Sequence, residues 1–340
     1  MNGLRVRGFN RREFLAGASA ISATSLLGLS RTAAAETRPE VTTIRLVGTP
    51  SICIAPQYVA EELLRVEGFE NVQYVADTIE VGTSRPVALG EADINMSFVG
   101  PLLVRMGTDQ PIVVLAGVHV GCYELFGNSG IKALRDLRGK TVSVPGLGST
   151  HHVFLSSMLA YVGIDPRKDV RWVTTQTPVD AMHLFVEGKV DAYLGFPPQP
   201  QELRAKKIGR VIVNTAVDRP WSQYFCCMVT ANREFVARYP VATKRALRAI
   251  LKAADICAQE PEWAARYMVK KGYGANYDFA LEVVKEVSYN TWRTYEPEDT
   301  LRFHALRLQE VGMIKSSPQK LIAQGTDWRF LNELKKELKA

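Results

Sequence analysis

Strand and helix patterns alternate along the first half of this 340-residue sequence, and this alternation restricts the fold more than any other feature. Each strand segment is a short run of β-branched and apolar residues, and each helical segment has apolar residues spaced three and four apart. Strands that alternate with helices of this length indicate parallel α/β sheets. The expected strands are 43–47, 72–75, 94–99, 112–116 and 141–144, and the expected helices are 56–66, 86–89 and 149–162.

The chain after Ala231 has a different pattern. Apolar residues there recur with the spacing of amphipathic helices, and no run of alternating residues interrupts them. The C-terminal region is therefore expected to be helical. The predicted helices are 241–258, 262–271, 279–287 and 299–311, with 330–338 as a possible last one.

Two segments that lie 98 residues apart resemble each other. Gly90–Phe98 aligns without gaps with Gly188–Phe196, and each has glycine first, aspartate fourth and phenylalanine last. Both predict a helix end, a tight turn, a buried strand and a phenylalanine at the strand's carboxyl end. The offset has the size of a small α/β domain and is too long for a solenoid repeat. We expect two similar lobes, with chance similarity as the alternative.

The N-terminus has the three parts of an export signal. A basic stretch ends at Arg11-Arg12, an apolar run follows to Leu29, and Ala33-Ala34-Ala35 provides a small-x-small cleavage site. The arginine pair before Phe14-Leu15 resembles the twin-arginine motif, which directs export of folded proteins. The alternative is an ordinary secretory signal with a chance arginine pair. On either interpretation, residues 1–35 are removed and the mature protein, from about Glu36, is expected in the periplasm.

The charge argues against nucleic acid as a partner. The formal net charge is +7, but the first 35 residues hold five of the 42 basic and only one of the 35 acidic residues. The mature chain therefore has a net charge of +3, which is too small for a protein that binds a polyanion. No stretch after Leu29 has enough uninterrupted apolar residues to span a membrane.

Five cysteines are too few for a disulfide-stapled small fold, and their spacing indicates no metal site. They form no C-x-x-C motif and no zinc-ligand spacing with histidine. The adjacent Cys226 and Cys227 lie in an apolar segment, where we expect a buried strand in which cysteine acts as a small hydrophobic residue. No metal and no cofactor are therefore predicted.

The most informative local motif is the segment Gly146–His152, which follows an expected strand and opens an expected helix. It is neither a complete dinucleotide fingerprint nor a P-loop. A glycine turn that leads Ser149 and Thr150 into a helix N-terminus suits an anionic or polar ligand. The alternative is that one of these residues only caps the helix. His151 and His152 point about 100° apart on a helix, so they cannot both face one site.

No catalytic constellation is found, and no catalytic residue is predicted. The sequence contains no G-x-S-x-G and no H-E-x-x-H motif. In open α/β sheets, ligands bind beyond the carboxyl ends of the strands. That rule points to segments from both expected lobes, so the site is expected between them. The segments are 50–52, 82–84, 98–100, 149–151, 176–177 and residue 196.

Two segments resemble a known family. Leu134–Ser149 (LRDLRGKTVSVPGLGS) and Gly188–Ala192 (GKVDA) are similar to the nitrate/sulfonate/taurine-type solute-binding proteins of ABC importers, a superfamily that also includes binders of thiamine-precursor pyrimidines. The likeness extends from about Val41 to about Pro261. It implies an α/β, two-lobed periplasmic-binding-protein fold of type II that closes on its ligand by a hinge motion.

The resemblance also implies a division into lobes. Residues 36–120 with 226–340 would form the first lobe, on which the C-terminal helices would mainly pack, and 121–225 the second. Val113–Leu125 and Trp221–Val229 are the expected crossovers. Carried over by position, the ligand-binding residues would be Pro50, Ser51, Thr83, Ser84, Phe98, Gly100, Ser149, Thr150, His151, Gln176, Phe196 and Trp221.

The resemblance implies a periplasmic binding protein that captures a small anionic or heterocyclic solute and delivers it to an ABC permease in the inner membrane. The segment 51–55 is more apolar than expected for a nitrate or simple sulfonate site, and Arg85 is the one basic residue firmly in a nominated loop. A flatter ligand, stacked on Phe98, Phe196 or Trp221, is therefore an open alternative. A monomer without enzymatic activity is expected. The alternatives are an exported enzyme on the same fold and a sensory subunit that presents its ligand to a membrane receptor.

Overall fold

The computed structural model describes residues 36–49, 51–76, 84–274 and 276–339. The chain divides between Thr37 and Arg38 into two units, and the fold concerns the second, Arg38–Ala340. The predicted export signal, residues 1–35, lies outside the described residues. None of the helices described has both the length and the apolar character that crossing a membrane requires.

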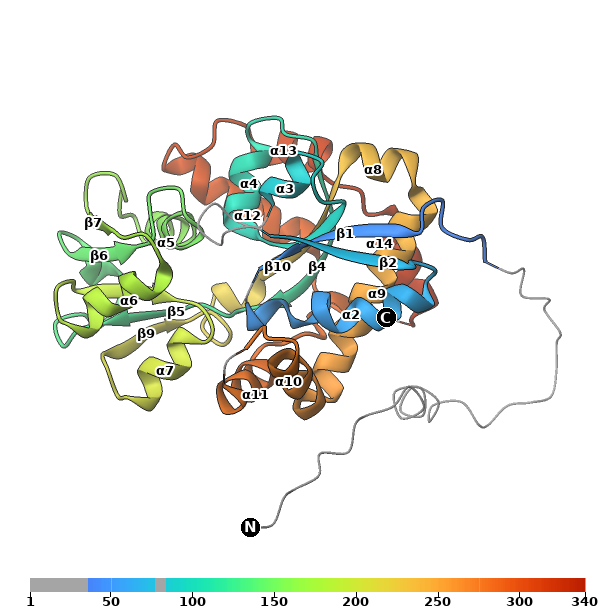
Figure 1. The fold of residues 1–340 in the computed structure, drawn as a ribbon. Coiled ribbons are helices and arrows are strands. Elements are labelled where there is room, and N and C mark those ends of the chain that lie inside the picture. The colour runs from blue at the N-terminus through green and yellow to red at the C-terminus, as the bar shows by residue number, and fades with distance from the viewer. Residues whose placement is uncertain (1–35, 50, 77–83, 275, 340) are drawn as a thin grey trace, which may run out of the picture. The chain divides into compact units, whose positions relative to one another are not determined.

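The described strands form three sheets (Figure 1). β1 (Thr43–Gly48) pairs in parallel with β2 (Asn71–Ala76). In the three-stranded sheet, β10 (Phe225–Asn232) lies between β3 (Ile94–Phe98) and β4 (Ile112–Val120) and is antiparallel to both. The five-stranded sheet has the order β7-β6-β8-β5-β9. Its members are β5 (Glu124–Gly127), β6 (Thr141–Val144), β7 (Arg171–Thr174), β8 (Ala192–Gly195) and β9 (Arg210–Asn214).

The prediction of parallel sheets is therefore only partly right. β6 is parallel to β7 and β8, but β5 is antiparallel to β8 and β9. The physical reason is the path of the chain. It leaves the three-stranded sheet through β4 into β5 and returns through β9 into β10. Because the outgoing and returning strands are neighbours in both sheets, they must run in opposite directions.

Most predicted helices form within one or two residues of their expected ends. The helices of the first part of the chain are α2 (Ala55–Val66), α3 (Arg85–Ala88), α4 (Val99–Met106), α5 (Thr150–Tyr161), α6 (Pro178–Val186) and α7 (Gln199–Ala205). The later ones are α8 (Arg233–Arg238), α9 (Pro240–Gln259), α10 (Pro261–Lys270), α11 (Tyr277–Glu286), α12 (Pro297–Glu310), α13 (Pro318–Gly325) and α14 (Arg329–Glu337). α4 corrects one expectation, because Val99 and Gly100, predicted in a cleft loop, are the first residues of this helix. Pro101 fits there, since the first turn of a helix needs no amide hydrogen from it.

The two similar segments have the same local structure. Gly90 and Gly188 both have a positive φ, +72° and +70°, which glycine adopts without strain. The carboxylate of Asp93 accepts a hydrogen bond of 2.8 Å from the backbone of Arg45 on β1, and that of Asp191 accepts one of 2.8 Å from the backbone of Thr141 on β6. Each aspartate thus joins the start of one buried strand to a neighbouring segment, and each segment then ends in phenylalanine.

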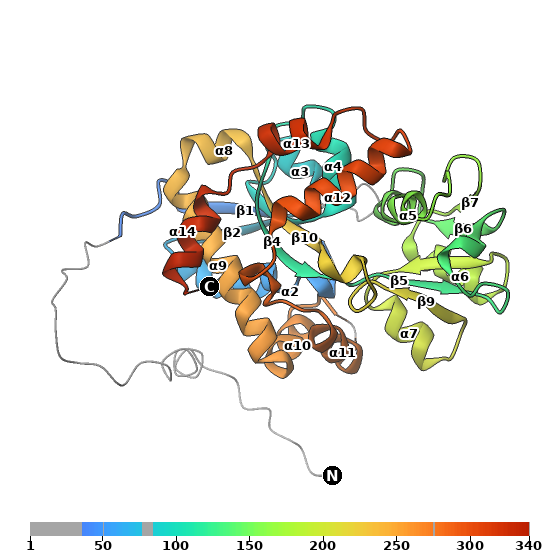
Figure 2. The same cartoon turned by 180° about the vertical axis from the view of Figure 1, so that it is seen from behind.

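The C-terminal helices pack mainly beside the two-stranded and three-stranded sheets, but two of them also contact α5 and α7, which lie between strands of the five-stranded sheet in the chain. α8, α9 and α14 contact β4, and α9 packs along α2 (Figures 1 and 2). α12, however, lies against α5, where the rings of Phe303 and Tyr161 are 5.9 Å apart. α11 meets α7, where Arg204 forms ion pairs of 2.6 Å with Glu282 and 2.7 Å with Glu286.

His304 makes this packing dependent on pH. It lies on α12 with its ring 5.5 Å from that of Phe154 on α5, and burial lowers its pKa to about 3. The unfolded chain protonates histidine below about pH 6.5, whereas the folded protein resists protonation down to its lower pKa. The stabilisation that comes from the buried, neutral ring of His304 is therefore complete above about pH 6.5 and is lost as the pH falls toward 3.

We predict that His304→Gln reduces the loss of stability on acidification. The expected difference is about 2 kcal/mol at pH 5, measured from urea unfolding at pH 7 and pH 5. His183→Gln is the control, because His183 lies on α6 and is exposed. Equal acid dependence in the wild type and in His304→Gln would contradict the assignment to burial.

Candidate functional site

The three-stranded and five-stranded sheets meet at a cluster of aromatic rings. Phe98 ends β3, Phe196 follows β8, and their ring centroids are 5.8 Å apart. Tyr123, in the connection between β4 and β5, lies 6.0 Å from each of them. All three side chains are buried. The equivalent phenylalanines of the two similar segments thus come together, and the chain crossing between the sheets supplies the third ring.

His151 adds a polar group to this cluster. It lies in the first turn of α5, with its ring centroid 5.0 Å from that of Phe196 and 6.0 Å from that of Tyr123. It is 1% exposed, and burial lowers its pKa to about 3, so the ring is a neutral imidazole at neutral pH. One turn later, Phe154 stacks on Tyr123 with a centroid distance of 4.7 Å.

The N-terminus of α5 has the geometry of a capped helix. The Oγ of Ser149 accepts a hydrogen bond of 3.3 Å from the backbone of His152, and the backbone of Gly148 donates to Nδ1 of His152 at 3.0 Å. The ring of His152 faces Trp172, 4.7 Å away, rather than the aromatic cluster. The two histidines therefore point to different places, as the sequence predicts, and the capping role of Ser149 is confirmed.

Two residues of the cluster have buried polar atoms with no hydrogen-bond partner among the described residues. These atoms are the hydroxyl of Tyr123 and both ring nitrogens of His151, and the hydroxyls of Thr49 after β1 and Ser84 before α3 are also buried without a partner. Buried polar groups are usually paired, so each such group needs an explanation. Within the cluster, a hydroxyl group and a neutral imidazole thus lie beside aromatic faces. This arrangement can bind a small polar molecule.

The structure brings together only some of the residues predicted for the site. Phe98, His151 and Phe196 meet in the aromatic cluster, with Thr150 beside His151 at the start of α5. Ser84 is buried, and its Oγ is one of the atoms without a partner. Pro50 and Thr83 lie outside the described residues.

Other predicted residues lie elsewhere or have another role. A Cβ built on Gly100 in α4 would lie 3.2 Å from Val153 of α5, so this glycine permits close helix packing. Trp221 packs on Tyr161, 5.3 Å away at the far end of α5 from His151, and on Phe303. Gln176 is exposed and has no described contact with the cluster. Arg85 is also exposed.

Sequence reasoning missed Thr49, Tyr123 and Phe154. Thr49 directly follows β1, so the rule of the strand's carboxyl end could have included it. Tyr123 lay within the predicted crossover Val113–Leu125, but no pattern indicated that its ring would reach the site.

Ser51, which was predicted, is buried with its Oγ 3.2 Å from the Sγ of Cys53. Cys53 lies close to two further residues with metal-ligating atoms, His119 and Cys227.

Solved structures of binding proteins have a similar fold. The periplasmic nitrate-binding protein NrtA from Synechocystis PCC 6803 matches with a TM-score of 0.73 and 18% identity, over 89% of this chain and 90% of that one. The alkanesulfonate-binding protein SsuA from Xanthomonas axonopodis pv. citri, bound to MOPS, matches with a TM-score of 0.65 and 14% identity, over 85% and 99%. The periplasmic aliphatic sulphonate-binding protein SsuA from Escherichia coli matches with 0.64 and 18%, over 82% and 90%.

At these identities the likeness concerns the fold, and it confirms the α/β periplasmic-binding-protein architecture that the resemblance implied. A search of curated proteins finds no match to the sequence. The family comparison is more direct, because the model of one family matches residues 37–272, which is more than half of the chain. The chain therefore belongs to the NMT1-like family.

Proposed function

We propose that this protein is the periplasmic substrate-binding component of an ABC importer and that it captures a small solute between its two lobes. The aromatic cluster is the observation that carries the proposal, because β3, the β4–β5 connection, β8 and α5 all contribute to it. Its buried hydroxyl and imidazole groups are suited to hydrogen bonds with a solute. The printed functions of the neighbouring structures, nitrate and sulfonate binding, agree with this role.

The chemistry of the cluster supports a small anionic or heterocyclic solute. Aromatic faces favour a flat, partly apolar molecule, and the neutral His151 can donate one hydrogen bond and accept another. The N-terminus of α5 favours negative charge nearby. A pyrimidine-like heterocycle uses all of these groups, whereas a nitrate-like or sulfonate-like anion relies mostly on the helix terminus. The solute class extends from sulfonate, taurine and nitrate analogues to pyrimidine analogues.

Binding would proceed by hinge closure between residues 36–120 with 226–340 and residues 121–225. The ion pairs of Arg204 on α7 with Glu282 and Glu286 on α11 would hold the closed form, since α7 falls within 121–225 and α11 within 226–340 of the proposed division. The closed form is what a permease would recognise. The mature protein would act as a monomer in the periplasm after twin-arginine export, with a cognate permease as its partner. It would release its solute chemically unchanged.

We predict that a matching solute raises the melting temperature of the purified protein. A ligand at about 100 times its dissociation constant adds roughly 2.7 kcal/mol, enough for a shift of a few degrees. The panel comprises nitrate, taurine, alkanesulfonates, carboxylates, pyrimidines and flavins, with denaturing mass spectrometry to detect a solute that co-purifies. A solute converted to product during incubation would instead favour an exported enzyme. No shift and no co-purified solute would contradict the binding role.

We also predict that His151→Ala weakens binding of the solute found in that panel by about tenfold to a hundredfold, because one or two buried hydrogen bonds are lost. His152→Ala is the matched control, since His152 lies next in the helix but faces Trp172. Calorimetric titration measures both affinities. Equal losses in the two variants would place the effect in the stability of α5 rather than in contact with the solute.

The helix terminus is tested separately. Changing Ser149 and Thr150 together to Ala removes the cap and the hydroxyl of the first residue of α5. We expect weaker binding, most of all for anions, while the protein stays folded because one cap contributes only about 1 kcal/mol. Calorimetry with an anionic and an uncharged solute, together with the melting temperature, measures the effect. Unchanged affinity for the anion would exclude the helix terminus from the site.

A further inference from the structure

Four of the five cysteines converge in the core, although they are far apart in the sequence. Cys53 lies in the short helix η1 (Ile52–Ile54), Cys122 in the β4–β5 connection, and Cys226 and Cys227 on β10. The Sγ atoms of Cys122 and Cys226 are 3.1 Å apart, and the thiol of Cys53 interacts with those of Cys122 and Cys227. All five thiols are buried and free. The fifth, Cys257 on α9, lies outside this group, so the role of a small hydrophobic residue suits it better than the other four.

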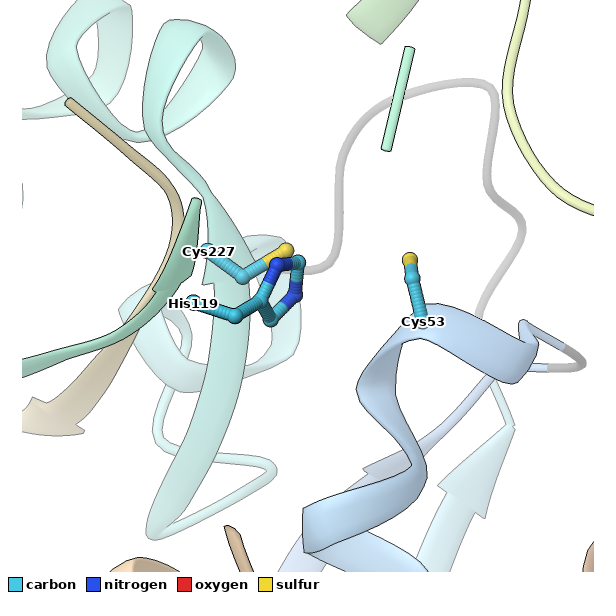
Figure 3. Close-up of side chains that lie close together, drawn as sticks. All are labelled: Cys53, His119 and Cys227. Atoms are coloured by element: carbon cyan, nitrogen blue, oxygen red, sulfur yellow. The ribbon is translucent and has the colours of Figure 1, made fainter. Parts of the chain in front are cut away.

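His119 completes the group with an imidazole. The ligating atoms of Cys53, His119 and Cys227 all lie within 4.8 Å of one another, and Figure 3 shows the histidine ring beside Cys227. Nδ1 of His119 faces the backbone carbonyls of Val120 at 3.4 Å and Gly121 at 3.2 Å. Carbonyl oxygens only accept hydrogen bonds, so in the neutral ring Nδ1 carries the proton. Nε2 then has a lone pair, and it is buried with no hydrogen-bond partner among the described residues.

This arrangement has the features of a metal site in proteins. A carbonyl that accepts from one ring nitrogen of a ligating histidine fixes the ring and leaves the other nitrogen free to bind. We propose that Cys53, His119 and Cys227 bind one Zn²⁺ ion, with the neighbouring Cys122 or Cys226 as the fourth ligand. Tetrahedral zinc with thiolate and imidazole ligands needs separations of roughly 3.7 Å between ligand atoms, which small side-chain rotations reach from the present positions.

The ligand chemistry supports zinc. With a third thiolate from Cys122 or Cys226 the ligand set is three cysteines and one histidine, which is one of the sets found in structural Zn²⁺ sites, and the site has a net charge of −1. Cys53 and Cys227 would bind the ion as thiolates. Metal binding requires that form. The ion would join η1, β4 and β10, and this proposal does not depend on the identity of the solute.

The test is metal binding by protein purified after expression of the full chain. The reduced protein is stripped with a chelator, titrated with Zn²⁺ or Co²⁺, freed of loose metal and assayed by elemental mass spectrometry. We expect a single ion per chain, a thiolate-to-cobalt charge-transfer band, and a higher melting temperature with Zn²⁺. Cys53→Ser and Cys227→Ser should lose all three, whereas the control Cys257→Ser, also buried, should keep them.

If the variants fail to fold, the wild-type protein alone still decides the test. Its retention of zinc and its cobalt charge-transfer band are measured without any substitution. Failure of the reduced wild type to retain either metal would overturn the proposal, and so would equal retention by Cys53→Ser. A Cys122–Cys226 disulfide in a protein that binds no metal after reduction would also overturn it and would assign the close thiol pair to covalent cross-linking.

Discussion

The contact between Phe98 and Phe196 connects the halves of this structure, and the site depends on it. Each ring is placed by a buried strand whose start is fixed by an aspartate that binds the backbone of a neighbouring segment. The two rings are buried against each other and against Tyr123, so apolar area is removed from water where the chain passes between the sheets. The imidazole of His151 is buried beside the same rings, so a hydrogen bond that it forms there is shielded from water.

Where periodicity and turn residues predicted a helix, its bounds were nearly right, because these signals are local. No element was predicted at β5, β7, β9, α6, α7 or α13. The repeated Gly–Asp–Phe pattern predicted two similar lobes, and the rule of the strands' carboxyl ends placed Phe98 and Phe196 among the residues of a site between them. The start of α4 could not be predicted in the same way, since the apolar residues Phe98 and Val99 are adjacent and nothing in the local sequence indicates that the strand ends between them. Antiparallel pairing of β10 with β4 depends on the path of the whole chain, which no short pattern contains.

Within the candidate site, sequence reasoning found His151 and both phenylalanines but not Tyr123. The difference is physical: the strand-end rule applies to loops at one edge of a sheet, whereas Tyr123 reaches the cluster from the connection between two sheets. The cluster of Cys53, His119 and Cys227 shows the same limit more strongly. Metal motifs are recognised by short spacings within one segment, and here the ligating atoms come from three segments separated by 66 and 108 residues. Only the fold brings them together.

The central place of β10 has a consequence for the order of folding during synthesis. The strands of the five-stranded sheet, β5 to β9, are consecutive in the chain, so all of them are present once Asn214 has been synthesised. In the three-stranded sheet, β3 and β4 are each hydrogen-bonded to β10 and not to each other, and β10 is made later. Both sheets contain long-range pairs, whose formation is slow because a loop must close before the contacts form. The five-stranded sheet can therefore pair before β10 exists, whereas β3 and β4 can join a common sheet only after it.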